Sequence, residues 1–142
     1  KTQPVMEIIY TEEKNISKDE LFSLYDDAGW SIYTKNLQKL SDAVGNSYLT
    51  ITARVDGILA GLIRIISDGL TIVYVQDILV LKQFKRMKIG TELMKRVLER
   101  FIDVRQIVLT TDNSEEQIKF YESLGFKRNS ELDINSFIKI QN

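Results

Sequence analysis

The sequence VYVQDILVLKQFKRMKIGTELMKRVLER, residues 73–100, changes its hydrophobic period at a short basic turn. Residues 73–81 are mostly apolar and rich in strand-forming side chains, which is typical of a central strand covered on both faces. From Gly90 to Phe101, apolar residues recur every three or four positions, which predicts an amphipathic helix. We therefore predict a buried strand, a turn over residues 82–90 and a helix.

The turn and the helix start together predict a site for anions. The first turn of a helix has backbone N–H groups without partners and lies at the positive end of the helix dipole, so it binds phosphates. Lys82, Lys85, Arg86 and Lys88 add positive charge, and Gly90 allows a ligand to approach closely. Locally, a solvated basic turn is the more common arrangement. The sequence has neither the Walker motif G-x-x-x-x-G-K-[ST] nor the dinucleotide motif G-x-G-x-x-G.

Composition limits the possible functions. The 142 residues are 44% hydrophobic and 27% charged, which predicts one globular domain over residues 1–142. A net charge of −1 argues against a general nucleic-acid binder, and no apolar run is long enough for a membrane span. Without a signal-peptide pattern or cysteine, a cytoplasmic location is the default expectation.

The chain has no histidine and no cysteine, which excludes Ser-His-Asp and Cys-His catalysis and the usual zinc sites. A magnesium site built from carboxylates stays open as an alternative, but the sequence shows no tight acidic cluster, and we expect no metal. Any general acid or base must then be Asp, Glu, Tyr, Lys or a bound water.

The remaining pattern alternates strands and helices. Ser17 and Glu20 form a predicted capping box at a helix that ends near Gly29, and Asp56-Gly57 predicts a hairpin. Further helices are expected at about 36–44, from Gly90 to Phe101, and from Ser114 to Gly125, with a polar loop at 30–33. The predicted strands are residues 5–10, 48–55, 58–66, 73–81, 106–111, 126–128 and 134–140. This pattern indicates a single mixed α/β domain.

In this order of elements, the sequence resembles the GCN5-related N-acetyltransferase (GNAT) family over essentially the whole chain, and its small bacterial members in particular. The family's acetyl-CoA loop, Q/R-x-x-G-x-G/A, aligns with residues 85–90: Lys85 stands for Gln or Arg, Lys88 replaces the first Gly, and Gly90 fits. FYESLGF, residues 120–126, closely matches the family's penultimate helix. The resemblance implies an α+β type fold with a central twisted mixed sheet of six to seven strands and about four helices.

The resemblance also implies the reaction, which is direct transfer of an acetyl group from acetyl-CoA to a primary amine of a small molecule or peptide. The protein would be a monomer or homodimer with no metal, nucleic-acid or membrane partner. The pantetheine arm would pair with the backbone of Ile78 to Val80, beside a strand bulge, and the pyrophosphate would lie on the amides of Arg86 to Thr91. The implied cofactor-binding residues are Ile78, Leu79, Val80, Lys85, Arg86, Met87, Lys88, Ile89, Gly90, Thr91, Asn113 and Phe120.

The family often places a tyrosine at the position of Tyr121, where it protonates the departing thiolate; by its local pattern alone, Tyr121 would be a core residue. The implied substrate-binding residues are Trp30, Tyr33, Tyr74 and Gln76. No base is evident. Asp77 follows Gln76, but strand alternation points it to the opposite face unless a bulge intervenes, and a water chain ending on the strand backbone is an equal alternative.

Two other functions fit the same fold. The imperfect loop and the missing base are consistent with a catalytically weak acyl-CoA-binding sensor. An interaction module is the third possibility, and the net charge argues against its nucleic-acid version.

Overall fold

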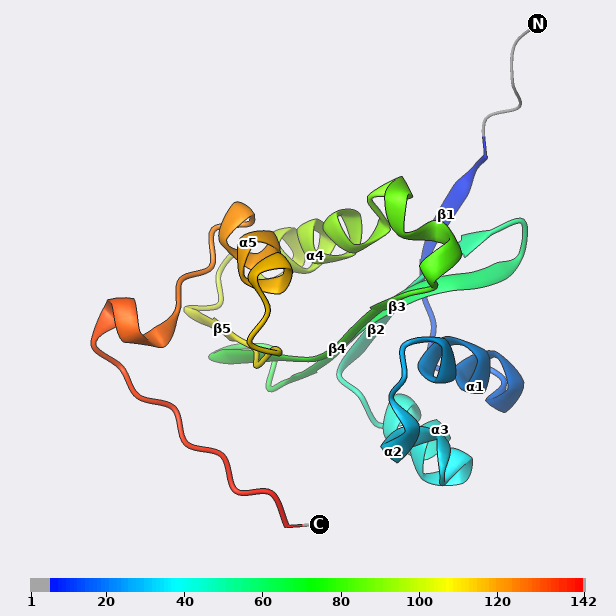
Figure 1. Ribbon diagram of the computed structural model, residues 1–142, viewed down its shortest axis with the longest axis horizontal. Helices are drawn as coiled ribbons and strands as arrows, with labels where there is room; N and C mark the ends of the chain where they lie inside the picture. Colours follow the sequence, from blue (N-terminus) through cyan, green and yellow to red (C-terminus); the bar gives the residue numbers. More distant parts are fainter. Residues whose placement is uncertain (1–5, 142) are drawn as a thin grey trace, which may run out of the picture. The chain divides into compact units, whose positions relative to one another are not determined.

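The computed structural model describes residues 6–141, which divide into two compact units, one up to Leu109 and one from Thr110. The first unit contains β1 (Ile8–Glu12), α1 (Lys18–Asp27), α2 (Ser31–Thr34), α3 (Leu37–Gly45), β2 (Leu49–Val55), β3 (Ile58–Ser67), β4 (Ile72–Val80), the 3₁₀ helix η1 (Lys82–Met87), α4 (Ile89–Arg100) and β5 (Gln106–Val108). The second contains α5 (Glu115–Ser123) and the 3₁₀ helix η2 (Asn129–Leu132) (Figure 1).

The strands of the first unit form one mixed sheet in the order β1-β2-β3-β4-β5. Within β1 to β4, each strand is antiparallel to the next, and β5 runs parallel to β4. The β2–β3 turn uses positive φ angles at Asp56 (50°) and Gly57 (79°), which is the geometry that an Asp-Gly hairpin favours. This sheet confirms the predicted α/β class and the hairpin.

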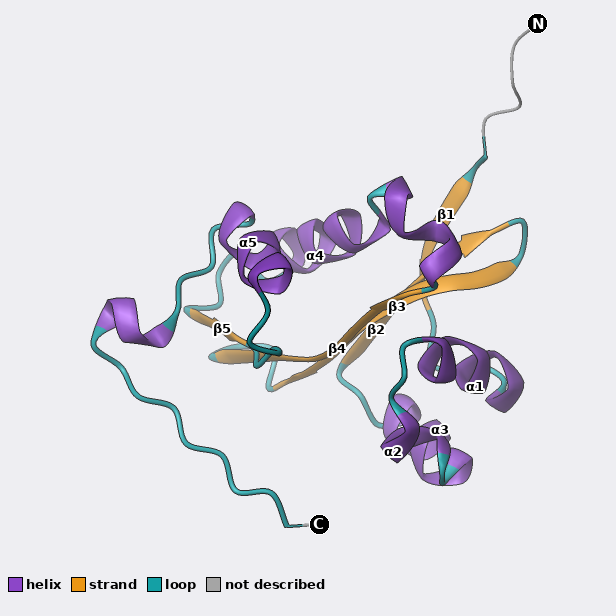
Figure 2. Ribbon diagram, in the orientation of Figure 1, coloured by secondary structure: helices purple, strands orange, loops and turns teal. Residues whose placement is uncertain are grey.

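Helices cover both faces of the sheet in the first unit (Figure 2). On one face, α1 and α3 bury Leu21, Leu24, Tyr25, Leu40 and Val44 against Leu59, Leu62 and Leu79. On the other face, α4 buries Leu93, Met94 and Val97 of the predicted stripe, together with Ile89, which precedes that stripe. Every residue of β4 is therefore buried or half-buried, as expected for a central strand. Each fully buried Leu or Ile side chain of the core stabilises the fold by about 1.5–3 kcal/mol relative to an exposed one.

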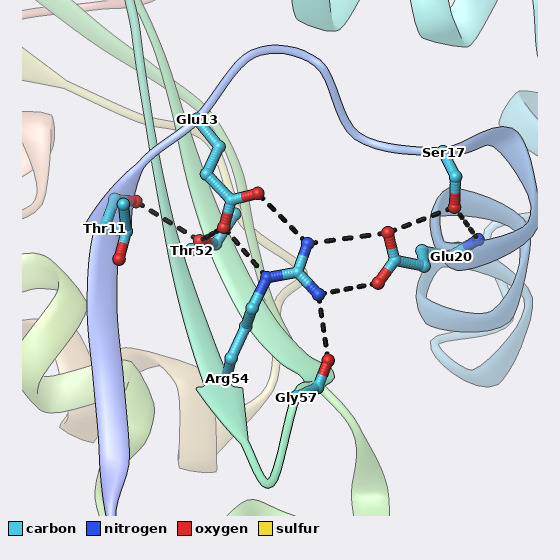
Figure 3. Close-up of polar contacts among 7 residues, drawn as sticks. All are labelled: Thr11, Glu13, Ser17, Glu20, Thr52, Arg54 and Gly57. Atoms are coloured by element: carbon cyan, nitrogen blue, oxygen red, sulfur yellow. Dashed lines mark hydrogen bonds and ion pairs between the residues drawn. The ribbon is translucent and has the colours of Figure 1, made fainter.

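The start of α1 is held by a polar network (Figure 3). Ser17 caps the helix by accepting the backbone N–H of Glu20 at 3.2 Å, which confirms the predicted cap. Arg54 of β2 lies between two carboxylates, donating from Nε to Glu13 (2.9 Å) and from Nη1 to Glu20 (2.6 Å). The network joins three parts of the chain: strand β2, the segment that follows β1, and helix α1. It therefore fixes where α1 begins.

Several predicted boundaries are wrong. Residues 126–128 and 134–140 form no strand, because a strand needs a hydrogen-bonded neighbour and neither segment has one in the described part of the chain. The backbone N–H of Phe126 instead bonds the carbonyl of Tyr121 at 3.1 Å, which closes the end of α5.

The described residues therefore contain five strands instead of six to seven, and five α-helices with two 3₁₀ helices instead of about four helices. The predicted loop at 30–33 contains α2, the basic turn is helical, and the strand predicted at 106–111 ends at Val108. The strand predicted from Val5 begins at Ile8, with Val5 itself outside the described residues. No helix within residues 6–141 is long and apolar enough to cross a membrane.

Candidate active site

One edge of β4 is only partly paired. β4 pairs with β3 from Val73 to Val80, but with β5 only from Ile72 to Tyr74. Beyond Tyr74, no residue in the described part of the first unit continues the ladder on the β5 side of β4, and this open length includes Ile78, Leu79 and Val80. Backbone N–H and C=O groups on an open strand edge can pair with an extended ligand.

A bulge changes which side chains share a face of β4. Arg64 pairs with Asp77 and Ile65 with Val75, so Gln76 is an extra residue on β4. Because of this bulge, neighbouring residues Gln76 and Asp77 both reach α1 and α2. Gln76 Nε2 donates to Tyr33 Oη at 3.1 Å, and Tyr25 Oη donates to Asp77 Oδ2 at 2.7 Å. The bulge therefore does intervene, and simple alternation does not apply to Asp77.

Asp77 lies in a buried polar cluster. Arg64 Nε donates to Asp77 Oδ2 at 2.7 Å, and the two side chains are 6% and 0% exposed. Oδ1 of Asp77 is buried and has no hydrogen-bond partner among residues 6–141. Burial and the neighbouring Asp77 carboxylate raise the pKa of Tyr25 far above its usual range, so its hydroxyl stays protonated and acts as a donor.

Sequence reasoning missed Tyr25 and Arg64 as members of this cluster. Arg64 could have been found, because it is the one charged residue in the apolar stretch 58–66, which was predicted to pair with the strand that carries Asp77. A lone charge in a buried strand calls for a partner of opposite charge nearby. Tyr25 gave no comparable signal, since its spacing fits the apolar face of α1.

The predicted substrate-binding residues of the first unit lie on the α1–α2 side of β4. Trp30 and Tyr33 are half-buried and pack against Tyr25, with ring centroids 6.0 and 5.5 Å from the Tyr25 ring. The pKa of Tyr33 is raised, mainly by burial, with smaller contributions that include Asp77 and Tyr74. Together with Gln76, these rings form a partly exposed aromatic and polar surface.

The predicted phosphate turn consists of η1 and the first turn of α4. Phe84 is buried and anchors η1, while Lys85 and Arg86 are exposed and Met87 is half-buried. Lys88 joins the two helices in the left-handed conformation (φ 60°, ψ 28°). Lys88 stands where the family motif has glycine, and glycine adopts this conformation without the steric cost that other residues incur.

The start of α4 provides free backbone donors. The first helical hydrogen bond runs from the Glu92 N–H to the Lys88 carbonyl at 3.1 Å, so the N–H groups of Ile89, Gly90 and Thr91 have no partner inside the helix. The side chain of Ile89 is fully buried, so Ile89 can offer a ligand only its backbone. The exposed basic side chains around this helix start are Lys82, Lys85, Arg86 and Lys88.

The other predicted site residues lie in the second unit. Asn113 is exposed in the turn before Ser114, which caps α5 by accepting the Gln117 N–H at 3.2 Å. Tyr121 is 8% exposed and packs edge-on against Phe120 and Phe126, with centroid distances of 5.0 and 5.9 Å. Burial raises the pKa of Tyr121, and a hydrogen bond with Thr111 acts in the opposite direction. The Tyr121 phenol is therefore protonated at neutral pH.

No described residues form a group of three or more His, Cys, Asp or Glu that could hold a metal ion. The first unit offers hydrogen-bonding groups along a strand edge and backbone donors for an anion at a helix start, and the second unit offers a protonated, buried tyrosine.

Comparisons with known proteins agree on one family. Residues 10–142 match the family model described as an acetyltransferase (GNAT) domain. The fold is similar to a GNAT-family acetyltransferase from Streptococcus pneumoniae TIGR4, with 31% identity over 95% of this chain and 98% of that chain, and a TM-score of 0.84.

A probable acetyltransferase from meticillin-resistant Staphylococcus aureus has 23% identity over 94% of this chain and 100% of that one, with a TM-score of 0.77. A structure of AAC(6')-Iy in complex with a bisubstrate analog, CoA-S-monomethyl-acetylneamine, shares the fold at 16% identity, with 96% and 98% of the two chains covered and a TM-score of 0.62. A search of curated protein sequences found no significant match. With the family model matched from residue 10 to 142, the chain belongs to the GNAT family of acetyltransferases.

Proposed function

We propose that this protein is an acetyl-CoA-dependent N-acetyltransferase that transfers an acetyl group directly to a primary amine of a small molecule or peptide. The observation that carries the proposal is the open edge of β4, which leads through η1 to the unpaired N–H groups of α4. An open strand edge suits the amide-containing pantetheine arm, and a helix start among exposed cations suits the phosphates. Family membership and the CoA analog bound to AAC(6')-Iy support the same chemistry.

This arrangement indicates which residues would bind acetyl-CoA. The backbone of Ile78, Leu79 and Val80 would pair with the pantetheine arm, and the amides from Arg86 to Thr91 would hold the pyrophosphate. Lys85, Arg86 and Lys88 would contribute charge-assisted contacts. Asn113 and Phe120 of the second unit are proposed as further contacts to the pantetheine arm. The match to the family model across both units supports treating residues 1–142 as one domain.

Acetyl-CoA supplies the acetyl group as an activated thioester. Tyr121 holds a proton on Oη, and we propose that it passes this proton to the sulfur that leaves. Burial raises the pKa of Tyr121 above the ordinary phenol value of about 10, so the phenol keeps its proton until a thiolate, whose conjugate acid has a pKa of about 8.5, forms beside it. Trp30, Tyr33, Tyr74 and Gln76 would then line the acceptor, where the aromatic faces favour an amine-bearing substrate.

The structure weighs against Asp77 as the base that removes a proton from the amine. Its Oδ2 accepts hydrogen bonds from both Arg64 and Tyr25, and its Oδ1 is buried. An ion-paired carboxylate without an exposed oxygen cannot reach a substrate proton directly. We therefore propose that water removes the amine proton, and that Asp77 holds the β4 bulge and the aromatic residues in place.

The test combines binding with turnover. Calorimetry should detect CoA binding to the wild-type protein, and release of free thiol from acetyl-CoA should depend on an amine from a panel of small amines and peptides. Gly90→Glu adds bulk and negative charge at the proposed pyrophosphate site and should abolish CoA binding in a folded protein. Gly90→Ala adds a methyl group without charge and is the matched control. Unchanged CoA affinity in Gly90→Glu would show that the site is elsewhere.

The same experiment separates the enzyme from its alternative. The Asp77 carboxylate is engaged by Arg64 and is buried, so it is not accessible as a base, and this observation favours a catalytically weak acyl-CoA-binding sensor or interaction domain. CoA binding without thiol release for any amine in the panel would favour that alternative. Two further predictions are a cytoplasmic location, which a localisation experiment can test, and a monomeric or homodimeric state, which sedimentation can test.

A further inference from the structure

The corner between β4 and η1 is held by a side chain from another element. Asp27, the last residue of α1, accepts the backbone N–H of Lys82 through Oδ2 at 2.8 Å. Lys82 is the first residue of η1, and its N–H has no partner within that helix. Leu81 precedes η1 and has no polar side chain with which to cap it. Asp27 therefore supplies the missing cap from α1.

The position of Asp27 is fixed together with that of Trp30. Helix α1 ends in a Schellman-type turn, in which the Trp30 N–H bonds the Tyr25 carbonyl (3.0 Å) and the Gly29 N–H bonds the Asp26 carbonyl (2.9 Å). Gly29 takes the left-handed conformation that this turn requires (φ 78°). Asp27 and the Trp30 backbone thus belong to one hydrogen-bonded turn, and a shift of one moves the other.

The same segment is attached to β4 at two more points. Tyr25 Oη bonds Asp77 Oδ2, and Tyr33 Oη accepts from Gln76 Nε2 at the bulge. Those two contacts hold the aromatic residues against the strand. The contact from Asp27 is the one of the three that reaches the turn carrying the proposed phosphate ligands.

We propose that Asp27 is a positioning residue that couples the acetyl-CoA turn to the aromatic surface for the acceptor amine. The proposal rests on the function proposed above. When CoA binds at η1 and the start of α4, the Asp27–Lys82 hydrogen bond transmits the effect to the α1–α2 turn and with it to Trp30. By reciprocity, an acceptor bound against Trp30 and Tyr33 strengthens CoA binding through the same contact.

The single tryptophan of the chain makes this coupling measurable, because Trp30 is the only tryptophan fluorophore. Three variants separate the possible causes. Asp27→Ala removes the cap, and Asp27→Asn keeps an acceptor oxygen while removing the charge. Asp26→Ala removes a neighbouring charge from an exposed side chain that makes no hydrogen bond or ion pair among the described residues.

In the wild-type protein, saturating CoA should change the emission of Trp30, and calorimetry should give the CoA dissociation constant. Asp27→Ala should raise that constant by roughly 3- to 10-fold, within the range expected for a lost helix cap, and should lose the emission change even at CoA saturation. Asp27→Asn should restore both, and Asp26→Ala should behave as the wild type. Thermal melts should show a small fall for Asp27→Ala, of the size expected for one lost helix cap, and no change for Asp26→Ala.

The outcomes distinguish the inference from the function beneath it. Absence of CoA binding to the wild type would overturn the proposed function and the coupling together. CoA binding with an unaltered Trp30 emission, or an emission change that persists in CoA-saturated Asp27→Ala, would overturn the coupling and leave the function intact. Equal losses in Asp26→Ala and Asp27→Ala would show that negative charge, and not the hydrogen bond to Lys82, is responsible.

Discussion

Asp77 of β4 and Arg64 of β3 lie directly opposite each other in the sheet and form a buried ion pair, with 2.7 Å between Oδ2 and Nε. The pair sits beside the bulge at Gln76, where the register between the two strands shifts. Buried opposite charges specify one register, because any slip would separate them in a low-dielectric environment. We infer that the pair holds the bulge that turns Gln76 and Asp77 toward α1 and α2.

Asp77→Asn should therefore act mainly on stability. Asparagine keeps the shape of the side chain but leaves the Arg64 guanidinium, 6% exposed, without a compensating charge. Removing one partner of a buried pair costs about 3–5 kcal/mol. Urea unfolding should report a loss of this size. The matched double variant, Arg64→Leu with Asp77→Leu, removes both charges and should lose less than the single change. A double variant that is less stable than Asp77→Asn would contradict this account.

The basic turn predicts salt-sensitive binding. Lys85, Arg86 and Lys88 are exposed, so their attraction to phosphates is screened as ionic strength rises. Replacing all three by glutamine should weaken CoA binding at about 0.05 M salt and make the affinity nearly independent of salt up to about 0.5 M, by calorimetry. Lys95→Gln is the control, because Lys95 is exposed on α4 two turns beyond the helix start. A wild-type affinity that stays flat with salt would mean that these side chains point away from the ligand.

The network around Arg54 predicts a pH dependence of stability (Figure 3). Hydrogen bonds from Arg54 lower the pKa values of Glu13 and Glu20 in the folded protein. Glutamate with a lowered folded pKa stabilises the fold fully above its ordinary pKa of about 4.3, and that contribution is lost as the pH falls through the folded values. The wild-type melting temperature should thus fall on acidification below about pH 5.

Arg54→Gln should have a lower melting temperature than the wild type at neutral pH, and its melting temperature should fall less on acidification. The curves of melting temperature against pH for the two proteins should therefore converge near pH 3, at about the acid end of glutamate titration. Thermal melts at a series of pH values measure this, with Lys95→Gln as the control for loss of a cation. Parallel curves for the wild type and Arg54→Gln would mean that the contacts around Arg54 do not stabilise the charged glutamates.

Local patterns predicted the elements that local physics determines. The period of α4, the Ser17 cap and the Asp56-Gly57 hairpin each depend on residues close in sequence, and each is present. Residues 134–140 show the limit of this approach. Their composition suits a strand, but pairing depends on a neighbour that the pattern cannot name, and the structure gives them none among the described residues.

The candidate site was predictable where a motif is contiguous. The turn at residues 85–91 could be proposed directly as an anion site, since the groups that would bind the anion follow one another in the chain. The contacts of Tyr25 with Asp77 and of Asp27 with Lys82 join residues more than 50 positions apart, and no local spacing encodes them. The orientation of Asp77 depends on a bulge, and one inserted residue changes the face of every side chain beyond it.

Tyr121→Phe is the sharpest test of the proposed acid. The ring packs against Phe120 and Phe126, and phenylalanine keeps that packing while removing the proton donor. The hydroxyl also hydrogen-bonds Thr111, so the variant should lose only about 0.5–1.5 kcal/mol of stability. Loss of a positioned acid should lower kcat by about 10²-fold or more, with the affinity for CoA unchanged. Steady-state kinetics with an accepted amine and calorimetry with CoA measure the two quantities.

Thr111→Val provides the matched control for Tyr121→Phe, because it removes the same hydrogen bond and leaves the phenol in place. Its melting temperature should fall by a similar small amount, while kcat should stay near the wild-type value. Equal losses of kcat in the two variants would mean that the hydrogen bond, and not the proton, matters. Full kcat in Tyr121→Phe would leave the thiolate to be protonated by water, since no other change in that variant could replace the missing donor. A large fall in melting temperature in Tyr121→Phe alone would instead identify Tyr121 as a core residue whose buried hydroxyl maintains the fold.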